Sequence, residues 1–168
     1  MSESLATRYL TVDDAEIFKT LRLRSLKEEP DSFFFTYKET KDKPLSYWQG
    51  LLAKEYNIGA FMADQLVGFS GMWVEEGEKI KHRAYLGAVY VAPEARGKGV
   101  AKRMLGDLIQ KAEEIGLEHL RLSTNSKNET NVGLYTKMGF EPYGIEKNYL
   151  KLEDGSYIDE VQMIKFLK

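Results

Sequence analysis

Two closely spaced glycines with basic neighbours, Gly97 and Gly99 in the run RGKGVA, have the clearest chemical potential in this chain. Glycine adopts positive φ at little cost and has no Cβ, so backbone N–H groups in such a turn can converge on a ligand. A helix expected to begin at Val100 would add N–H groups without intrahelical acceptors and the positive end of its dipole. Arg96 and Lys98 supply two cations. The segment is predicted to bind an anion, and a diphosphate suits it better than a single carboxylate.

The spacing of these residues argues against two common nucleotide motifs. A phosphate-binding loop of the GxxxxGK[ST] type needs a lysine and a hydroxyl after its second glycine, whereas Gly99 is followed by Val100 and Ala101. The dinucleotide pattern GxGxxG lacks its third glycine here. An ordinary glycine-containing turn between a strand and a helix remains the alternative.

The segment resembles the R/Q-x-x-G-x-G/A motif of the GNAT superfamily of N-acetyltransferases, which Arg96, Gly99 and Ala101 match after a YVAPEA turn. The resemblance implies that the turn binds the pyrophosphate of acetyl-coenzyme A. It also implies that the strand edge from Val89 to Val91 binds the pantetheine arm and that a backbone N–H there polarises the thioester. The implied coenzyme-binding residues are Val89, Val91, Arg96, Gly97, Lys98, Gly99, Val100, Ala101 and Asn128.

A second stretch, NETNVGLYTKMGF, resembles the N-x-x-A-x-x-L-Y-x-x-x-G-F pattern of the same superfamily. By this resemblance Tyr135 is the general acid and Asn128 contacts the coenzyme. The chain departs from the pattern at Asn131, where an alanine is usual; its amide is expected either to alter the coenzyme groove or to turn to solvent. From the residues alone, Tyr135 is better interpreted as a core aromatic, and Asn128 can be a helix cap.

The resemblance implies transfer of an acetyl group from acetyl-coenzyme A to an amine in a ternary complex. The competing hypothesis is a coenzyme-binding module without transferase activity. No carboxylate lies on the central strand LGAVYV, so the general base stays open among Glu28, Glu29, Glu146 and Glu160. The acceptor, a small-molecule or peptide amine, is open as well, and acidic residues are expected to help bind it: Glu28, Glu29, Asp31, Asp159 and Glu160.

Composition limits the class of protein. With 168 residues, 43% hydrophobic and 30% charged, the chain is expected to be one globular domain spanning residues 1–168. A net charge of −2 gives no general attraction to nucleic acid or to an anionic membrane. There is no cysteine and there are two histidines, so no metal cofactor is expected. No signal or membrane segment is recognisable, which makes the cytoplasm the expected location, and the sequence leaves a homodimer open.

Hydrophobic periodicity predicts the elements that hold these motifs. Strands are expected over residues 5–10, 56–63, 66–74, 80–92, 118–124, 140–152 and 157–167, and helices over residues 11–29, 44–54, 100–115 and 128–138. With the resemblance, this order implies one α/β domain of the GNAT-like acyltransferase fold, with a mixed, mostly antiparallel sheet and helices on both faces.

The hydrophobic and charge patterns predict which of several side chains lie in the core and which in solvent. Ile17 is expected to share a buried face with Phe18 and Leu21. Arg22 and Arg24 are expected in solvent, as are the charges of the loop 75–79. The aromatics in the run FFFTY, Phe33, Phe34, Phe35 and Tyr37, fit the core or, by the resemblance, a wall of the acceptor pocket equally well, and at least two of them are expected in the core.

Overall fold

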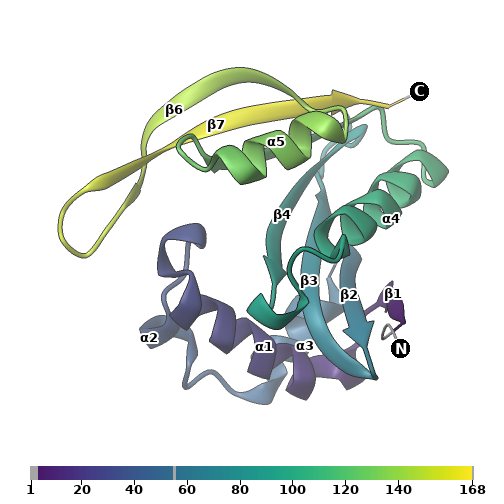
Figure 1. Ribbon diagram of the computed structural model, residues 1–168. Coiled ribbons are helices and arrows are strands. Elements are labelled where there is room, and N and C mark those ends of the chain that lie inside the picture. Colours follow the sequence, from purple (N-terminus) through teal and green to yellow (C-terminus); the bar gives the residue numbers. More distant parts are fainter. Residues whose placement is uncertain (1–3, 55, 168) are drawn as a thin grey trace. The chain divides into compact units, whose positions relative to one another are not determined.

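The computed structural model describes residues 4–54 and 56–167. Figure 1 shows the strands and helices, most of which lie close to their predicted ranges, although the short helix over residues 37–40 was not predicted. The strands are β1 (Leu5–Tyr9), β2 (Tyr56–Met62), β3 (Gln65–Val74), β4 (Arg83–Val91), β5 (His119–Asn125), β6 (Glu141–Lys151) and β7 (Tyr157–Phe166). The helices are α1 (Ala15–Glu28), α2 (Tyr37–Thr40), α3 (Leu45–Ala53), α4 (Val100–Glu114) and α5 (Glu129–Lys137), with short 3-10 turns η1 (Val12–Asp14), η2 (Pro30–Ser32) and η3 (Pro93–Ala95).

The strands form a seven-stranded sheet in the order β1-β2-β3-β4-β5-β7-β6. Strand β4 pairs with β5 in parallel, while β1 with β2, β2 with β3, β5 with β7 and β6 with β7 pair antiparallel. The mixed, mostly antiparallel sheet is therefore confirmed. The chain forms two compact units, one from residues 1–73 and 88–108 and the other from residues 74–87 and 109–168.

Within the first unit, neighbouring residues of β3 face helices on opposite sides. A Cβ at Gly68 would lie 3.2 Å from Val100 and 3.1 Å from Met104 of α4. The next residue, Phe69, packs edge-on against Phe18 of α1 at 5.4 Å between ring centroids. Because successive strand residues point to opposite faces, helices cover both faces of the sheet here, as predicted.

The close approach at Gly68 explains why a strand interior contains this glycine. A Cβ there would stand 3.0 Å from the carbonyl oxygen of Tyr90, in β4. Real Cβ atoms are seldom so close to a backbone oxygen, so a larger residue would push β3 away from β4 and α4.

The β2–β3 hairpin turns one residue earlier than its sequence predicts. The turn lies at Ala63 and Asp64, with φ of 47° and 62°, in place of the expected Asp64-Gln65. Two consecutive positive φ values are typical of the hairpin turn that matches the right-handed twist of strands. The turn geometry here overrides the low preference of alanine for this conformation.

Strand β4 begins later than expected, at Arg83 and not at Ile80. Gly77 has φ of 125°, and its carbonyl accepts hydrogen bonds from the N–H groups of Ile80 and Lys81 at 3.0 and 2.8 Å. These bonds close a turn through the first residues of the expected strand. Further along β4, Ala88 has φ of 51°, an irregular position for a strand residue other than glycine.

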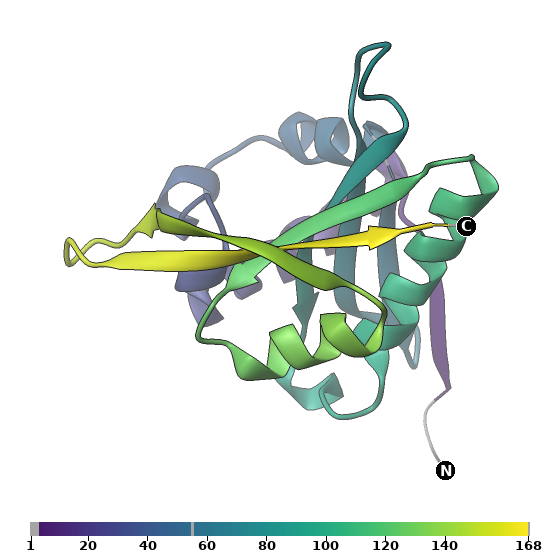
Figure 2. The ribbon, with the colours of Figure 1, turned by 90° about the horizontal axis from the view of Figure 1, so that it is seen from above.

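The second unit is built around a long hairpin. Figures 1 and 2 show β6 and β7 as a strongly twisted two-stranded ribbon with α5 alongside it. All residues of 141–148 are exposed, because β6 lies at the sheet edge, while β7 buries Val161 and Met163 against the core.

Ile17, expected on a buried face, is exposed instead, and so are two other apolar residues, Leu51 of α3 and Ile115 just beyond α4. Ile17, Leu51 and Ile115 keep 43%, 39% and 41% of their surface accessible. Successive helix residues are rotated by about 100°, so Ile17 is carried out of the face that buries Phe18 and Leu21. Only Phe33 of the aromatic run is buried, and the expectation of two core members was wrong, since Phe34 and Phe35 are 63% and 53% exposed.

Candidate functional site

The turn between β4 and α4 has the backbone conformation that its glycines favour. Gly97 and Gly99 have φ of 74° and 77°. A Cβ built at either position would meet nothing within 4 Å, so open space lies beside both residues. The conformation, and not crowding, is what requires glycine at both positions.

The amide N–H groups of this turn lack acceptors. Within residues 4–54 and 56–167, no backbone carbonyl or side chain accepts from the amides of Gly97, Lys98, Gly99, Val100 or Ala101. The first hydrogen bond of the helix runs from Arg103 N–H to the Gly99 carbonyl, at 3.0 Å. Five unpaired donors at a helix N-terminus, where the dipole is positive, form an anion site.

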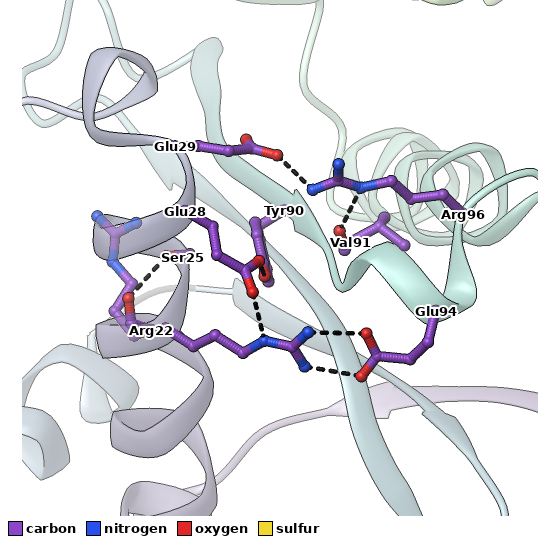
Figure 3. A network of polar contacts seen from close by, with 9 residues as sticks. Arg22, Ser25, Glu28, Glu29, Tyr90, Val91, Glu94 and Arg96 are labelled. Carbon is purple, nitrogen blue, oxygen red and sulfur yellow. Dashed lines mark hydrogen bonds and ion pairs between the residues drawn. The ribbon is translucent and has the colours of Figure 1, made fainter.

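The two cations beside the turn differ in their surroundings. The Arg96 guanidinium donates through Nε to the Val91 carbonyl at 2.9 Å and pairs with Glu29 (Figure 3). Lys98 makes no ion pair with any residue in the described part of the chain. Lys98 is therefore the cation available to a ligand, and Arg96 ties the turn to α1.

The final residues of β4 present backbone groups away from β3. Ala92 N–H donates to the Val67 carbonyl of β3 at 2.8 Å. Because a strand residue directs its N–H and C=O to one edge and its neighbour uses the other, Val91 and Val89 face the opposite edge. The described pairing of β4 with β5 covers only Arg83–Tyr85, so it does not occupy that edge at Val89 and Val91.

A polar network holds α1 against the segment that leads into the turn. Arg24 forms two hydrogen bonds to the carboxylate of Glu94, at 2.7 and 2.8 Å, and a third to Glu28 at 2.8 Å. The hydroxyl of Tyr90 donates to the same Glu28 (Figure 3). The hydrogen bonds from Arg24 lower the pKa of Glu94 to about 2. The expectation that Arg24 is simply solvated was wrong, because it missed the pair with Glu94, 70 residues away in the sequence.

Asn128 acts as the N-cap of α5. Its Oδ1 accepts from the Asn131 N–H at 3.0 Å, which leaves the Nδ2 group for other partners. The Asn131 side chain donates to Thr124 Oγ1 of β5 at 3.4 Å. The amide that departs from the family pattern thus turns toward β5, and not to solvent.

Tyr135 is buried on α5, with 5% of its surface exposed and its ring edge-on to Phe140 at 6.1 Å. No hydrogen bond to its hydroxyl occurs within residues 4–54 and 56–167. Burial raises the pKa of Tyr135 to about 12, so the phenol is protonated at neutral pH. It is a proton donor with no competing partner in the described chain.

A buried carboxylate lies in the same unit. Glu160 of β7 is 8% exposed and accepts a hydrogen bond from Ser123 of β5, whose Oγ is 2.6 Å from the hydroxyl of Tyr85. Burial raises the pKa of Glu160, and the charge of Glu146 across the hairpin adds to this effect. Its neighbour Asp159 lies nearer the surface and pairs with Lys147 at 2.7 Å.

Sequence reasoning missed the roles of several residues in these networks. Glu75, expected to be a solvated loop charge, pairs with both Arg83 and Arg121. Ser123 and Tyr85 gave no signal beyond strand periodicity, because their contact joins two strands 38 residues apart. The structure gathers Val89, Val91 and the residues 96–101 in the first unit, while Asn128 and Tyr135 belong to the second.

The histidines and carboxylates of the described ranges do not form a metal centre. Over those ranges, no three His, Asp or Glu side chains gather as metal ligands would. His119 packs on His82 and Phe166, at 5.3 and 5.5 Å between ring centroids, in a structural role. None of the described helices is both long and apolar enough to span a membrane.

Comparison with known proteins gives a consistent result. Residues 21–140 match the acetyltransferase (GNAT) family. An uncharacterised protein of Mycobacterium leprae is 34% identical over 108 residues, which are 63% of this chain but only 29% of that protein. A ribosomal protein bS18-alanine N-acetyltransferase of Haemophilus ducreyi is 29% identical over 68% of this chain and 76% of its own length.

Solved structures show the same fold. An acetyltransferase of the GNAT family from Streptococcus pneumoniae superimposes with a TM-score of 0.89 at 20% identity, covering 98% of this chain and 100% of that one. YncA of Salmonella typhimurium, solved with its cofactor acetyl-CoA, gives a TM-score of 0.82 at 16% identity, covering 98% and 95%.

Proposed function

Because this chain belongs to the GNAT acetyltransferase family, we propose that it transfers an acetyl group from acetyl-coenzyme A to an acceptor amine in a ternary complex. The observation that carries the proposal is the row of five unpaired amides from Gly97 to Ala101 at the start of α4. A diphosphate needs several donors on its oxygens, and a row of backbone amides supplies them without reorganisation. The family match, over residues 21–140, includes parts of both units, which supports one N-acetyltransferase domain over residues 1–168.

The proposed coenzyme contacts follow the order of the chain. The amides of the turn and the cation of Lys98 hold the pyrophosphate. The outward edge of β4 at Val89 and Val91 binds the pantetheine arm, and one N–H there polarises the thioester carbonyl. Asn128 contacts the coenzyme through Nδ2, because its Oδ1 is already used as the helix cap.

Tyr135 is proposed as the general acid. Attack by the amine nitrogen on the thioester carbonyl forms a C–N bond, and the C–S bond then breaks to release a thiolate. The nitrogen, which is positively charged after the attack, loses a proton to solvent as the amide forms. The Tyr135 hydroxyl gives the thiolate its proton and later regains one from solvent. The hydroxyl of Tyr135, which is protonated at neutral pH and has no partner in the described chain, supports this role.

Glu160 is the best supported of the four candidate bases. Glu28 pairs with Arg24 and accepts from Tyr90, interactions that lower its pKa and weaken it as a base. Glu29 is engaged by Arg96, and Glu146 is exposed on β6. Glu160 has no cationic partner within the described chain, and burial raises its pKa toward neutrality. Through a water molecule, it would accept the proton that the acceptor ammonium loses to become the neutral amine that attacks.

The test is an assay of thiol release from acetyl-coenzyme A with a panel of amino acids, small amines and peptides with free N-termini. The Haemophilus ducreyi relative, named for an alanine of a ribosomal protein, makes peptides a necessary part of the panel. Amine-dependent thiol release, with the acetyl group recovered on nitrogen by mass spectrometry, is expected. Coenzyme binding by calorimetry without thiol release for any acceptor would instead identify a non-catalytic binding module.

A further inference from the structure

One arginine in the first unit has no counter-ion. Within the described residues, Arg22 is the one arginine that does not pair with a carboxylate. The arginines that do so are Arg8, Arg24, Arg83, Arg96, Arg103 and Arg121. Arg22 Nη1 is shielded from solvent and has no hydrogen-bond partner. Figure 3 shows its guanidinium apart from the carboxylates of Glu28, Glu29 and Glu94.

Aromatic rings surround this cation. The Arg22 guanidinium carbon lies 4.1 Å from the ring centroid of Phe33 and 5.5 Å from that of Phe69. Burial lowers the pKa of Arg22 to about 10, so it is still charged at neutral pH. Ring faces attract a cation, but they do not replace the hydrogen bonds that the buried Nη1 group loses with water.

Arg8, in the same unit, is an arginine whose guanidinium has both a ring contact and a carboxylate partner. Its guanidinium also stacks on a ring, that of Phe61 at 4.5 Å, but it forms two hydrogen bonds to Asp14 at 2.8 and 2.7 Å as well. Arg22 has the ring contacts without the carboxylate. An uncompensated cation in a partly desolvated site favours any anion that can reach it.

The residues around Arg22 indicate which kind of anion this is. The guanidinium fork matches a carboxylate with two parallel hydrogen bonds. Phe34 and Phe35 follow Phe33 directly and are 63% and 53% exposed, so apolar surface lies next in the chain to the ring that contacts the cation. Arg22 as a whole keeps intermediate exposure, so part of its side chain lies at the surface.

We propose that Arg22 binds a carboxylate of the acceptor, and that the acceptor is an amino carboxylate with an apolar body, either a single amino acid or a short peptide with a free C-terminus. The inference rests on the proposed function in one respect: the carboxylate is assigned to the acceptor because the protein is proposed to be a transferase. The carboxylates expected to bind the acceptor amine are largely engaged, since Glu28 and Glu29 pair with arginines and Asp159 with Lys147.

The experiment compares acids with their amides, which differ in one charge. Acetylation of L-leucine, L-phenylalanine and Leu-Leu is measured against the three corresponding amides, for the native chain, Arg22→Met, Arg22→Lys and the matched control Arg8→Met. We expect the native chain to favour an acid over its amide by on the order of 10²-fold in kcat/KM, mainly through KM. Arg22→Met should abolish that preference, Arg22→Lys should retain part of it, and Arg8→Met should retain it fully. The ratio of kcat/KM for the acid to kcat/KM for its amide is then compared between the amino acids and the dipeptide. The larger ratio identifies the length of the acceptor.

A second readout does not need catalysis. N-acetyl-L-leucine should raise the Tm of the native chain and of Arg8→Met, but not that of Arg22→Met, and N-acetyl-L-leucinamide should raise none of them. Stabilisation of this kind without any thiol release would mean that the carboxylate site exists and the proposed transferase function is wrong. Equal use of acids and amides by an active native enzyme, or a preference for acids that survives in Arg22→Met, would overturn the role of Arg22 while leaving the transferase function intact.

Discussion

At the scale of single residues, the hydroxyl of Tyr135 separates an enzyme from a binding protein. The Tyr135→Phe variant keeps the ring that packs on Phe140 and removes a group without a hydrogen bond in the described chain. We therefore expect almost unchanged thermal stability and coenzyme affinity, with kcat lowered by about 10²–10⁴-fold, the usual contribution of a general acid. Steady-state kinetics, calorimetry and a thermal melt of the same preparation test this.

Two results would contradict that role. Joint loss of stability and coenzyme affinity would make the hydroxyl a structural group, and an unchanged kcat would make Tyr135 only a core aromatic. Tyr143→Phe, at a tyrosine of β6 that is 54% exposed, is the matched control and should change none of the three measurements.

Glu160 should give the stability of the protein a distinctive pH dependence. Burial raises the pKa of Glu160 in the folded state, so the folded protein binds this proton more tightly than the unfolded chain does. The contribution of Glu160 to the free energy of unfolding therefore falls as pH rises from the unfolded pKa, about 4.3, through the raised folded pKa. We expect Glu160→Gln to be more stable than the native chain above this window and equal to it below, in denaturant titrations across pH.

Asp159 provides a control of opposite sign on the neighbouring residue. The hydrogen bond from Lys147 lowers the pKa of Asp159, so its stabilising contribution is present above the unfolded pKa and is lost as pH falls through the folded pKa. Asp159→Asn should thus be less stable than the native chain at neutral pH. A Glu160→Gln variant that behaved like Asp159→Asn would show that the hydrogen bond from Ser123 outweighs the burial of the charge.

At the scale of elements, the β4–α4 turn can be tested with a charge. Gly99→Asp introduces a carboxylate where the coenzyme diphosphate is proposed to bind, and it should abolish coenzyme binding in calorimetry. Gly116→Asp is its matched control, because Gly116 lies just beyond the other end of α4 and has φ of 79° against 77° at Gly99. A Cβ at Gly116 would likewise meet nothing within 4 Å.

The dipole of α4 affects the stability of the two variants, Gly99→Asp and Gly116→Asp, in opposite directions. An aspartate is favourable at the N-terminus of α4 and unfavourable at its C-terminus, so Gly116→Asp should lose more stability than Gly99→Asp. Loss of binding in Gly99→Asp alone could then not be attributed to unfolding. Undiminished binding in Gly99→Asp would exclude this turn as the coenzyme site.

The elements that could be predicted from sequence are those fixed by local chemistry. The helix predicted over residues 100–115 follows from glycine conformation and apolar periodicity. It is confirmed over Val100–Glu114, with Gly116 at positive φ just beyond its end. The environment of Arg22 was predicted wrongly, because it depends on Phe33 and on Phe69, 47 residues further along by the numbering. Periodicity describes one element at a time, whereas a buried cation or a bridging glutamate such as Glu75 is created by packing between elements.

At the scale of the whole molecule, coenzyme binding should stabilise the fold. A ligand that binds only the folded state raises the free energy of unfolding by about 2.7 kcal/mol at a hundredfold excess over its Kd. Coenzyme A should therefore raise the Tm in a concentration-dependent manner. Pantetheine, which lacks the diphosphate, should give a much smaller shift, because it engages only the proposed β4 edge. Equal shifts from the two compounds would place the binding energy outside the turn.

Because the amides from Gly97 to Ala101 are unpaired, their hydrogen exchange should also report how long coenzyme stays bound at the turn. Amides without acceptors exchange their hydrogens with solvent deuterium far faster than those inside a helix or a sheet. In the free protein we expect residues 97–101 to exchange within the first labelling interval, while the later turns of α4 stay protected. Bound coenzyme should slow exchange at the turn, also in Tyr135→Phe, so one labelling curve would measure how long the coenzyme stays bound without any acceptor present.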